Sequence, residues 1–171
     1  MEAVVIGGGL CGVTTALLLA RGGMRVALLE ADRLGSGASG QSLGLATVQH
    51  GLLYSKLQAQ WGQEITQAYA TSQTAARGAM AALIQELGIP CGFQAQDSCL
   101  AAMSGEEERL LIQEEKASQA AGLAAAMTAG GECPFPVRCL LTVPCQAMLD
   151  PVAYLYGLAA DRKSTRLNSS H

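Results

Sequence analysis

Three glycines near the start of the chain are the residues whose type and spacing most clearly indicate ligand binding. Gly7, Gly9 and Gly12 form the pattern G-x-G-x-x-G. The first glycine of this pattern allows a tight turn, the second lets backbone approach a pyrophosphate, and the third lets a helix pack against a strand. Unpaired N–H groups at the start of that helix favour an anion. The pattern therefore predicts a pyrophosphate cradle, whose remaining backbone comes from Gly8, Leu10 and Cys11.

A carboxylate follows the cradle at the expected distance. Glu30 stands eighteen residues after Gly12 and ends an apolar run. An acid in this position accepts hydrogen bonds from the hydroxyls of an adenosine ribose. The glycines and the acid together predict a dinucleotide site. The alternative is a buried glycine-rich turn beside a solvated Glu30. Cys11, at the start of the helix, could be a redox-sensitive thiol; the alternative is a small residue that fits close to the ligand.

The elements needed to position these groups are predicted around them. Residues 3–6 have the apolar character of a buried strand, residues 10–21 have a helical repeat that ends at Gly22 and Gly23, and residues 25–30 form a second apolar run. This is a βαβ unit, which favours a parallel sheet. We expect an α/β protein with a Rossmann-like domain.

The rest of the chain contains further helices and strands. The pattern predicts a Gly/Ser-rich segment over 31–51, a helix over 56–87, strands over 91–103, a helix over 104–121 and a strand over 137–143. The helix over 56–87 is supported by an apolar repeat that includes Trp61 and Ile65, and Gly78 is its expected weak point. A capping box of Ser104 and Glu107 begins the next helix. Asp150 and Pro151 begin the last one.

Composition excludes several classes of function. Half the residues are hydrophobic, 15% are charged and the net charge is −3, so we expect a globular protein without a nucleic-acid partner. No basic segment precedes the apolar N-terminal run, and glycines interrupt it, which argues against a signal peptide or a membrane span. The six cysteines form no C-x-x-C pair. We expect reduced thiols, a cytoplasmic location and no metal site.

The acidic residues over 106–115 predict solvated helix turns.

The last eleven residues differ in composition from the chain before them. Residues 161–171, DRKSTRLNSSH, can be back-translated into a string that resembles a short-read sequencing adapter. We therefore interpret 161–171 as an artefactual tail. Residues 1–160 are then an incomplete, N-terminal part of a longer protein.

The long segment after Glu30 bears on which dinucleotide is bound. A nicotinamide-binding fold would continue promptly with another helix and strand, whereas this chain offers backbone N–H groups and the hydroxyls of Ser36, Ser39 and Ser42. Such a segment could wrap a larger cofactor that lies extended across the domain. It favours FAD over NAD.

These residues resemble a known family. The runs VVIGGGLCG, VALLEADRLGSGASG, LATVQHGLLYSKL and PFPVRCLLTVPCQAMLDPVAYLYGLA are similar to the N-terminal part of the D-amino-acid-oxidase-like FAD-dependent oxidoreductases. The third run looks most like a branch that often carries a C-terminal Rieske domain. No Rieske ligand pattern is present, so a [2Fe–2S] cluster would belong to a further C-terminal domain.

The resemblance implies a fold and an activity. It implies an FAD-binding half interleaved with an antiparallel substrate-binding half, the latter only begun in this chain. It places Ser39 and Gly40 in a second FAD-contacting loop, where Gln41 and Ser42 replace the family's frequent Arg-Asn. It implies oxidation of an amine or amino acid by hydride transfer to FAD, with catalytic residues and electron acceptor unassigned. His50 could lie near the flavin; the alternative is an ordinary loop histidine. Two other functions stay open: a nicotinamide-dependent dehydrogenase and a non-catalytic nucleotide-binding fragment.

Overall fold

The computed structural model describes residues 1–130 and 133–160, which form two compact units. Unit 1 contains residues 1–45, 81–93 and 149–160, and unit 2 contains residues 46–80 and 94–148. The two units are interleaved along the chain, as the family resemblance implies. The predicted tail, 161–171, lies outside the described residues. Within the described ranges, no helix combines the length and apolarity needed to cross a bilayer.

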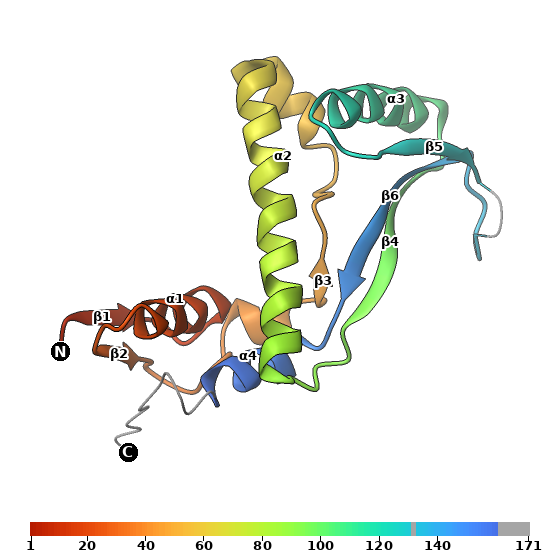
Figure 1. Cartoon of the computed structure of the whole chain (residues 1–171). Coiled ribbons are helices and arrows are strands. Elements are labelled where there is room, and N and C mark those ends of the chain that lie inside the picture. Colours follow the sequence, from red (N-terminus) through yellow and green to blue (C-terminus); the bar gives the residue numbers. More distant parts are fainter. Residues whose placement is uncertain (131–132, 161–171) are drawn as a thin grey trace. The chain divides into compact units, whose positions relative to one another are not determined.

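Unit 1 begins with the predicted βαβ unit (Figure 1). β1 (Ala3–Ile6) and β2 (Val26–Leu29) pair in parallel, and α1 (Leu10–Arg21) connects them. Parallel strands require such a crossover because the chain must return to the same end of the sheet. The carboxyl ends of both strands therefore meet at one edge, where the glycine turn and Glu30 lie.

Later segments of the chain complete the core of unit 1. α4 (Pro151–Ala159) contacts α1, and its Leu155 and Leu158 are fully buried, as is Leu17 of α1. A Cβ added at Gly157 would lie 2.3 Å from Ile89, so α4 packs tightly on the segment that follows α2. The core of this unit thus joins residues that are far apart in sequence.

Unit 2 contains an antiparallel sheet in the strand order β3-β6-β4, with β5 also paired to β6. The strands of this sheet are β3 (Leu45–Ala46), of which Ala46 belongs to unit 2, β4 (Gln94–Ala102), β5 (Ala126–Ala129) and β6 (Cys139–Met148). α3 (Gly105–Ala120) contacts β4, β5 and β6 (Figure 1). The core between them includes Leu111, Leu141 and Val143. This sheet is the antiparallel part that the resemblance implies.

β6 is longer than the strand predicted over 137–143. It continues through Pro144 to Met148. A register shift opposite Gln96 and Ser98 absorbs the irregularity, and Cys145 has a φ of 57°. The Cys145 N–H donates to Asp97 Oδ1 at 3.1 Å, outside the regular ladder. The prediction ended the strand before Pro144 because proline cannot donate to a regular ladder. At a bulge a proline is tolerated, so the strand continues beyond it.

The predicted long helix, α2 (Tyr54–Leu87), is interrupted at Gly62 and not at Gly78. Gly62 has φ 80° and ψ 175°, a conformation that glycine adopts readily. The interruption changes the helical phase, so Trp61 and Ile65 are 59% and 52% exposed, whereas Thr66 is buried. The predicted apolar repeat was therefore wrong at these two positions.

The predicted caps of α3 and α4 are confirmed. The Ser104 side chain accepts from the Glu107 N–H, and the Glu107 carboxylate accepts from the Ser104 N–H. The Asp150 side chain accepts from the N–H groups of Val152 and Ala153 at the start of α4.

Glu114 departs from the prediction of a solvated acidic face. Its side chain is 1% exposed, and its two oxygens accept from the Tyr54 and Ser55 N–H groups at 2.7 and 2.8 Å. Those groups begin α2, where backbone donors lack helical partners and an anion is favoured. Glu114 therefore caps a helix that starts sixty residues earlier in the chain.

Replacing Glu114 by alanine should destabilise unit 2 by about 3 kcal/mol, because the buried Tyr54 N–H and the part-buried Ser55 N–H would lose their acceptor. Gln113, its exposed neighbour on α3, provides the matched control, and Gln113→Ala should change stability by less than about 0.5 kcal/mol. Denaturant midpoints of the two variants measure the difference. Equal midpoints would show that the carboxylate does not stabilise the start of α2.

Candidate functional site

The glycine turn connects β1 to α1 at the edge where β2 also ends. Gly7 has a φ of 105°, which disfavours any side chain there, and its N–H donates to Leu29 O at 2.8 Å. Gly9 is the N-cap of α1 and supplies no side-chain hydrogen bond. The first turn of α1 contains no acidic residue. No acidic side chain therefore offsets the partial positive charge at the start of α1, which suits it to an external anion.

Gly12 allows the close packing that the motif predicts. A Cβ on Gly12 would lie 1.9 Å from Gly7 O and 3.6 Å from Val5 Cγ1. The first distance is far below any van der Waals contact, so only glycine fits. α1 can therefore approach the turn closely enough to direct its first N–H groups at a ligand held there.

Glu30 lies against this turn. Its Oε2 accepts from the Gly8 N–H at 2.5 Å, and its Oε1 accepts from the Asp32 N–H at 3.1 Å. These backbone donors, Gly8 first, lower the pKa of the Glu30 carboxyl below its ordinary value. The side chain is exposed and ionised at neutral pH, so its lone pairs can also accept from ribose hydroxyls.

The second loop meets the cradle directly. Ser39, in the short 3₁₀ helix η1 (Ala38–Gln41), has its Oγ 3.0 Å from the Leu10 N. A Cβ on Gly9 would lie 3.0 Å from the same Oγ, so only a narrow space separates the Gly9 backbone from the Ser39 hydroxyl. The Leu10 N–H donates to Ser39, which occupies a position where a phosphate oxygen could accept instead. This geometry fits an adenine dinucleotide.

Gly35, which was not predicted from the sequence, also closes this loop. The Gly35 N–H donates to Gly8 O at 3.0 Å, and its φ is 76°. A Cβ on Gly40 would lie 2.2 Å from Gly35 O, so Gly40 permits the loop to fold back on itself. The signal was present in the run GSG, where glycine density indicates positive φ angles.

Three other residues considered from the sequence have the following surroundings. Cys11 lies in the first turn of α1, its thiol is exposed, and its carbonyl accepts from Thr15 Oγ1 at 2.8 Å. Ser42 accepts from the Gly44 N–H at 3.2 Å. His50 belongs to unit 2.

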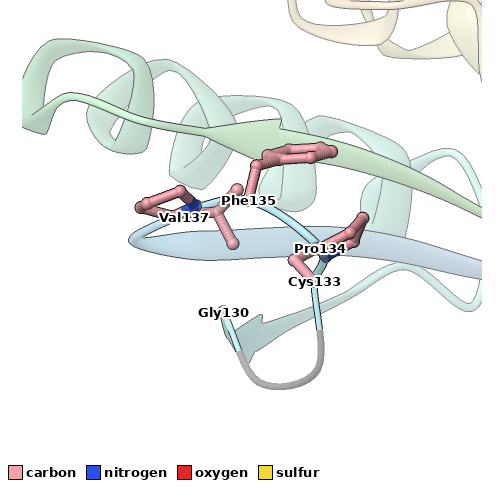
Figure 2. A pocket seen from close by; sticks show the side chains of 6 residues that line it. Gly130, Cys133, Pro134, Phe135 and Val137 are labelled. Carbon is pink, nitrogen blue, oxygen red and sulfur yellow. The ribbon is translucent and has the colours of Figure 1, made fainter.

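A hollow in unit 2 is separate from the predicted site residues. Figure 2 shows it at the connection between β5 and β6, lined by Gly130, Cys133, Pro134, Phe135, Pro136 and Val137. None of these residues belongs to the cradle, which is in unit 1.

The comparison with protein-family models decides the family. The model described as FAD dependent oxidoreductase matches residues 2–164, nearly the whole chain. The chain belongs to this FAD dependent oxidoreductase family. Membership agrees with the contacts that the glycine turn makes with Glu30 and with the second loop.

The relatives that this chain matches are longer than it is. YhfW of Bacillus subtilis (strain 168), whose name describes it as a candidate Rieske 2Fe-2S iron-sulfur protein, is 26% identical over 157 residues, which are 92% of this chain and 31% of YhfW. Glycine oxidase from Geobacillus kaustophilus has a similar fold, with a TM-score of 0.76, 21% identity, and coverage of 95% of this chain and 44% of its own.

A third relative has a structure described as containing FAD. L-alpha-glycerophosphate oxidase from Mycoplasma pneumoniae gives a TM-score of 0.64 at 17% identity, and the match covers 92% of this oxidoreductase chain and 41% of that protein. This chain therefore spans about a third to less than half of the relatives it matches.

Replacing Gly12 by alanine should strongly destabilise unit 1, because the new methyl group would overlap Gly7 O. Gly78 gives a matched control: it lies within α2, and an added Cβ would meet no atom within 4 Å. Gly78→Ala should stabilise the protein by about 0.5–1 kcal/mol, because alanine loses less conformational entropy in a helix. Thermal unfolding measures both changes. A Gly12→Ala variant as stable as the unmodified protein would contradict the packing of α1.

Proposed function

We propose that this chain is the N-terminal, FAD-binding portion of a flavin-dependent oxidoreductase that oxidises an amine or an amino acid. The observation that carries the proposal is the convergence of Ser39 Oγ on the Leu10 N–H beside a turn that a side chain at Gly9 would fill. The family match supports FAD as the dinucleotide. The name of glycine oxidase supports an amino-acid or amine substrate.

Each residue of the cradle has a defined role in this proposal. Gly7, Gly8 and Gly9 present backbone to the pyrophosphate, and the N–H groups of Leu10 and Cys11 direct the positive end of α1 at it. Gly12 brings α1 close enough to do so. Glu30 binds the ribose, and Ser39 and Gly40 close the second loop. Bound FAD would supply the chemistry by accepting a hydride equivalent from the substrate.

The remaining predictions about the whole protein are part of the same proposal. Residues 1–160 are an incomplete oxidoreductase domain, and any [2Fe–2S] cluster belongs to a domain beyond them. The fragment alone should not turn over substrate, because only the dinucleotide cradle is assigned within it. All six cysteines are free thiols, which supports a reducing, cytoplasmic location. The electron acceptor stays unassigned.

Blocking the cradle should abolish FAD retention in the full-length protein. A Gly9→Val side chain would overlap the space between the Gly9 backbone and Ser39 Oγ, where backbone must approach the pyrophosphate. Flavin absorbance of the purified protein measures retention, and Gly78→Ala is the matched glycine control. A folded Gly9→Val protein with undiminished FAD would contradict the assignment of the cradle.

Replacing Glu30 by glutamine should weaken FAD binding about tenfold, because a charge-assisted hydrogen bond to the ribose becomes a neutral one. Backbone donors lower the pKa of Glu30 in the folded protein. Its charged contribution is therefore complete above the ordinary carboxyl pKa and is lost only as pH falls through the lowered value. FAD titrations against pH check both effects. An unchanged dissociation constant in Glu30→Gln would assign Glu30 a purely structural role against Gly8.

A further inference from the structure

The second loop of unit 1 has a firmly held base. The Tyr156 hydroxyl donates to Leu34 O at 3.4 Å, and the Gly35 N–H donates to Gly8 O at 3.0 Å. A Cβ on Gly35 would lie 2.8 Å from Leu155 Cδ2, so the backbone at this point packs directly against α4. The base of the loop is therefore attached both to the glycine turn and to the core of unit 1.

The tip of the same loop is held by less. It consists of η1, whose first residue follows Gly37, and a Cβ on Gly37 would meet no atom within 4 Å. Gly37 and Gly40 are exposed, whereas Ser39 between them is half-buried. The hydrogen bond from the Leu10 N–H to Ser39 Oγ, 3.0 Å long, ties η1 to α1. Because glycine changes its backbone conformation at little steric cost, the tip can move while the base stays in place.

The Leu10 N–H is a donor that two acceptors can use. Leu10 is the first residue of α1, and the intrahelical bonds begin only at the Val13 N–H, which donates to Gly9 O at 2.9 Å. An N–H carries one proton, and a good hydrogen bond needs a donor angle above about 150°, so the group serves one acceptor well. The Ser39 hydroxyl and a phosphate oxygen would therefore compete for Leu10.

Glu30 holds the neighbouring donor in a different way. Its carboxylate accepts from the Gly8 N–H at 2.5 Å and from the Asp32 N–H at 3.1 Å. Bonds to an ionised acceptor are roughly twice as strong as bonds between neutral groups. Ser39 accepts a single bond as a neutral hydroxyl. A phosphate, which carries charge, should therefore displace Ser39 more readily than Glu30.

We propose that Ser39 is a latch: its hydroxyl holds the Leu10 N–H until a pyrophosphate oxygen replaces it, and residues 36–41 then move away from α1. This inference rests on the proposed function and adds a conformational step to it. An anion that binds here exchanges one hydrogen bond for another, so an isolated phosphate gains little. A dinucleotide also gains the contact between its ribose and Glu30. The latch therefore favours a dinucleotide over smaller anions.

The alternative is that Ser39 keeps its bond to the Leu10 N–H and donates its own proton to the phosphate. The two roles predict changes of opposite sign. Removing the hydroxyl frees a donor for the ligand if Ser39 is a latch, and removes a donor if Ser39 bridges. The geometry favours the latch, because Ser39 Oγ lies 3.0 Å from the Cβ position of Gly9 and leaves little room for a phosphate between them.

The test measures the binding of FAD and of inorganic pyrophosphate to the full-length protein after dialysis to remove bound ligand. Ser39→Ala should bind both ligands about fivefold more tightly, because binding no longer breaks a neutral hydrogen bond. Ser39→Cys keeps the shape of the side chain but offers a weak acceptor, so we expect roughly a twofold gain. Thr71→Ala removes an exposed hydroxyl from α2 and is the control. Flavin fluorescence reports FAD binding, and titration calorimetry reports pyrophosphate binding.

The inference is overturned if neither Ser39 variant binds either ligand more tightly than the unmodified protein does, and weaker binding would assign Ser39 the bridging role. Thermal unfolding shows whether each variant is folded, and Ser39→Cys keeps the test decisive if Ser39→Ala does not fold. Variants that bind pyrophosphate more tightly while no form of the protein binds FAD would contradict the proposed function and leave this inference standing. Tight FAD binding that both variants leave unchanged would do the opposite.

Discussion

The arrangement of the cradle depends on a backbone contact between Gly12 and Gly7. A single methyl group on Gly12 would lie 1.9 Å from Gly7 O, so α1 touches the turn that precedes it. This closeness brings the Leu10 N–H within reach of Ser39 and leaves the Gly8 N–H to face Glu30. If α1 were displaced outward by one side chain, its first N–H groups would no longer converge with the second loop. In the proposed function, the binding of an anion at this edge depends on this contact.

The parts of the structure that were predictable have local signals. Glycine spacing gave the turn, and the serine, aspartate and proline at helix starts gave the caps, because each of these effects acts within a few residues. Glu114 could not be assigned in this way, since its partners lie sixty residues away on another helix. Glu114 is the same residue type as the solvated glutamates near it, and only tertiary packing distinguishes the buried glutamate from the others.

Backbone irregularities were the other source of error. Gly62 and Gly78 both stand within one apolar repeat, and nothing local shows which of them leaves the helical conformation. Pro144 indicated the end of a strand, yet the bulge at Cys145 lets β6 continue. Within the site, Gly35 was overlooked because its role depends on Gly8, with which it pairs across the turn. At Cys145 and Gly35, a partner distant in sequence accompanies the irregular conformation.

The two units use different chemical means to present polar groups. Unit 1 presents mainly main-chain groups, which glycines expose and one carboxylate and one hydroxyl complement. Unit 2 presents an imidazole through buried glutamine, glutamate and tyrosine side chains. Main-chain groups recognise a constant part of a ligand, such as a pyrophosphate, and tolerate changes of sequence provided that the glycines remain.

The interleaving of the units also constrains the order of events during synthesis. Leu155 and Leu158 of α4 are fully buried in unit 1, whose first strands lie in residues 1–45. A ribosome adds about 5–20 residues per second, so the first βαβ unit waits roughly 5 to 20 seconds for the helix that completes its core. Unit 2 is interrupted only once and has all its described residues by position 148, so it can close first. The nascent βαβ unit is therefore exposed to chaperones, and to free cofactor, until α4 has been synthesised.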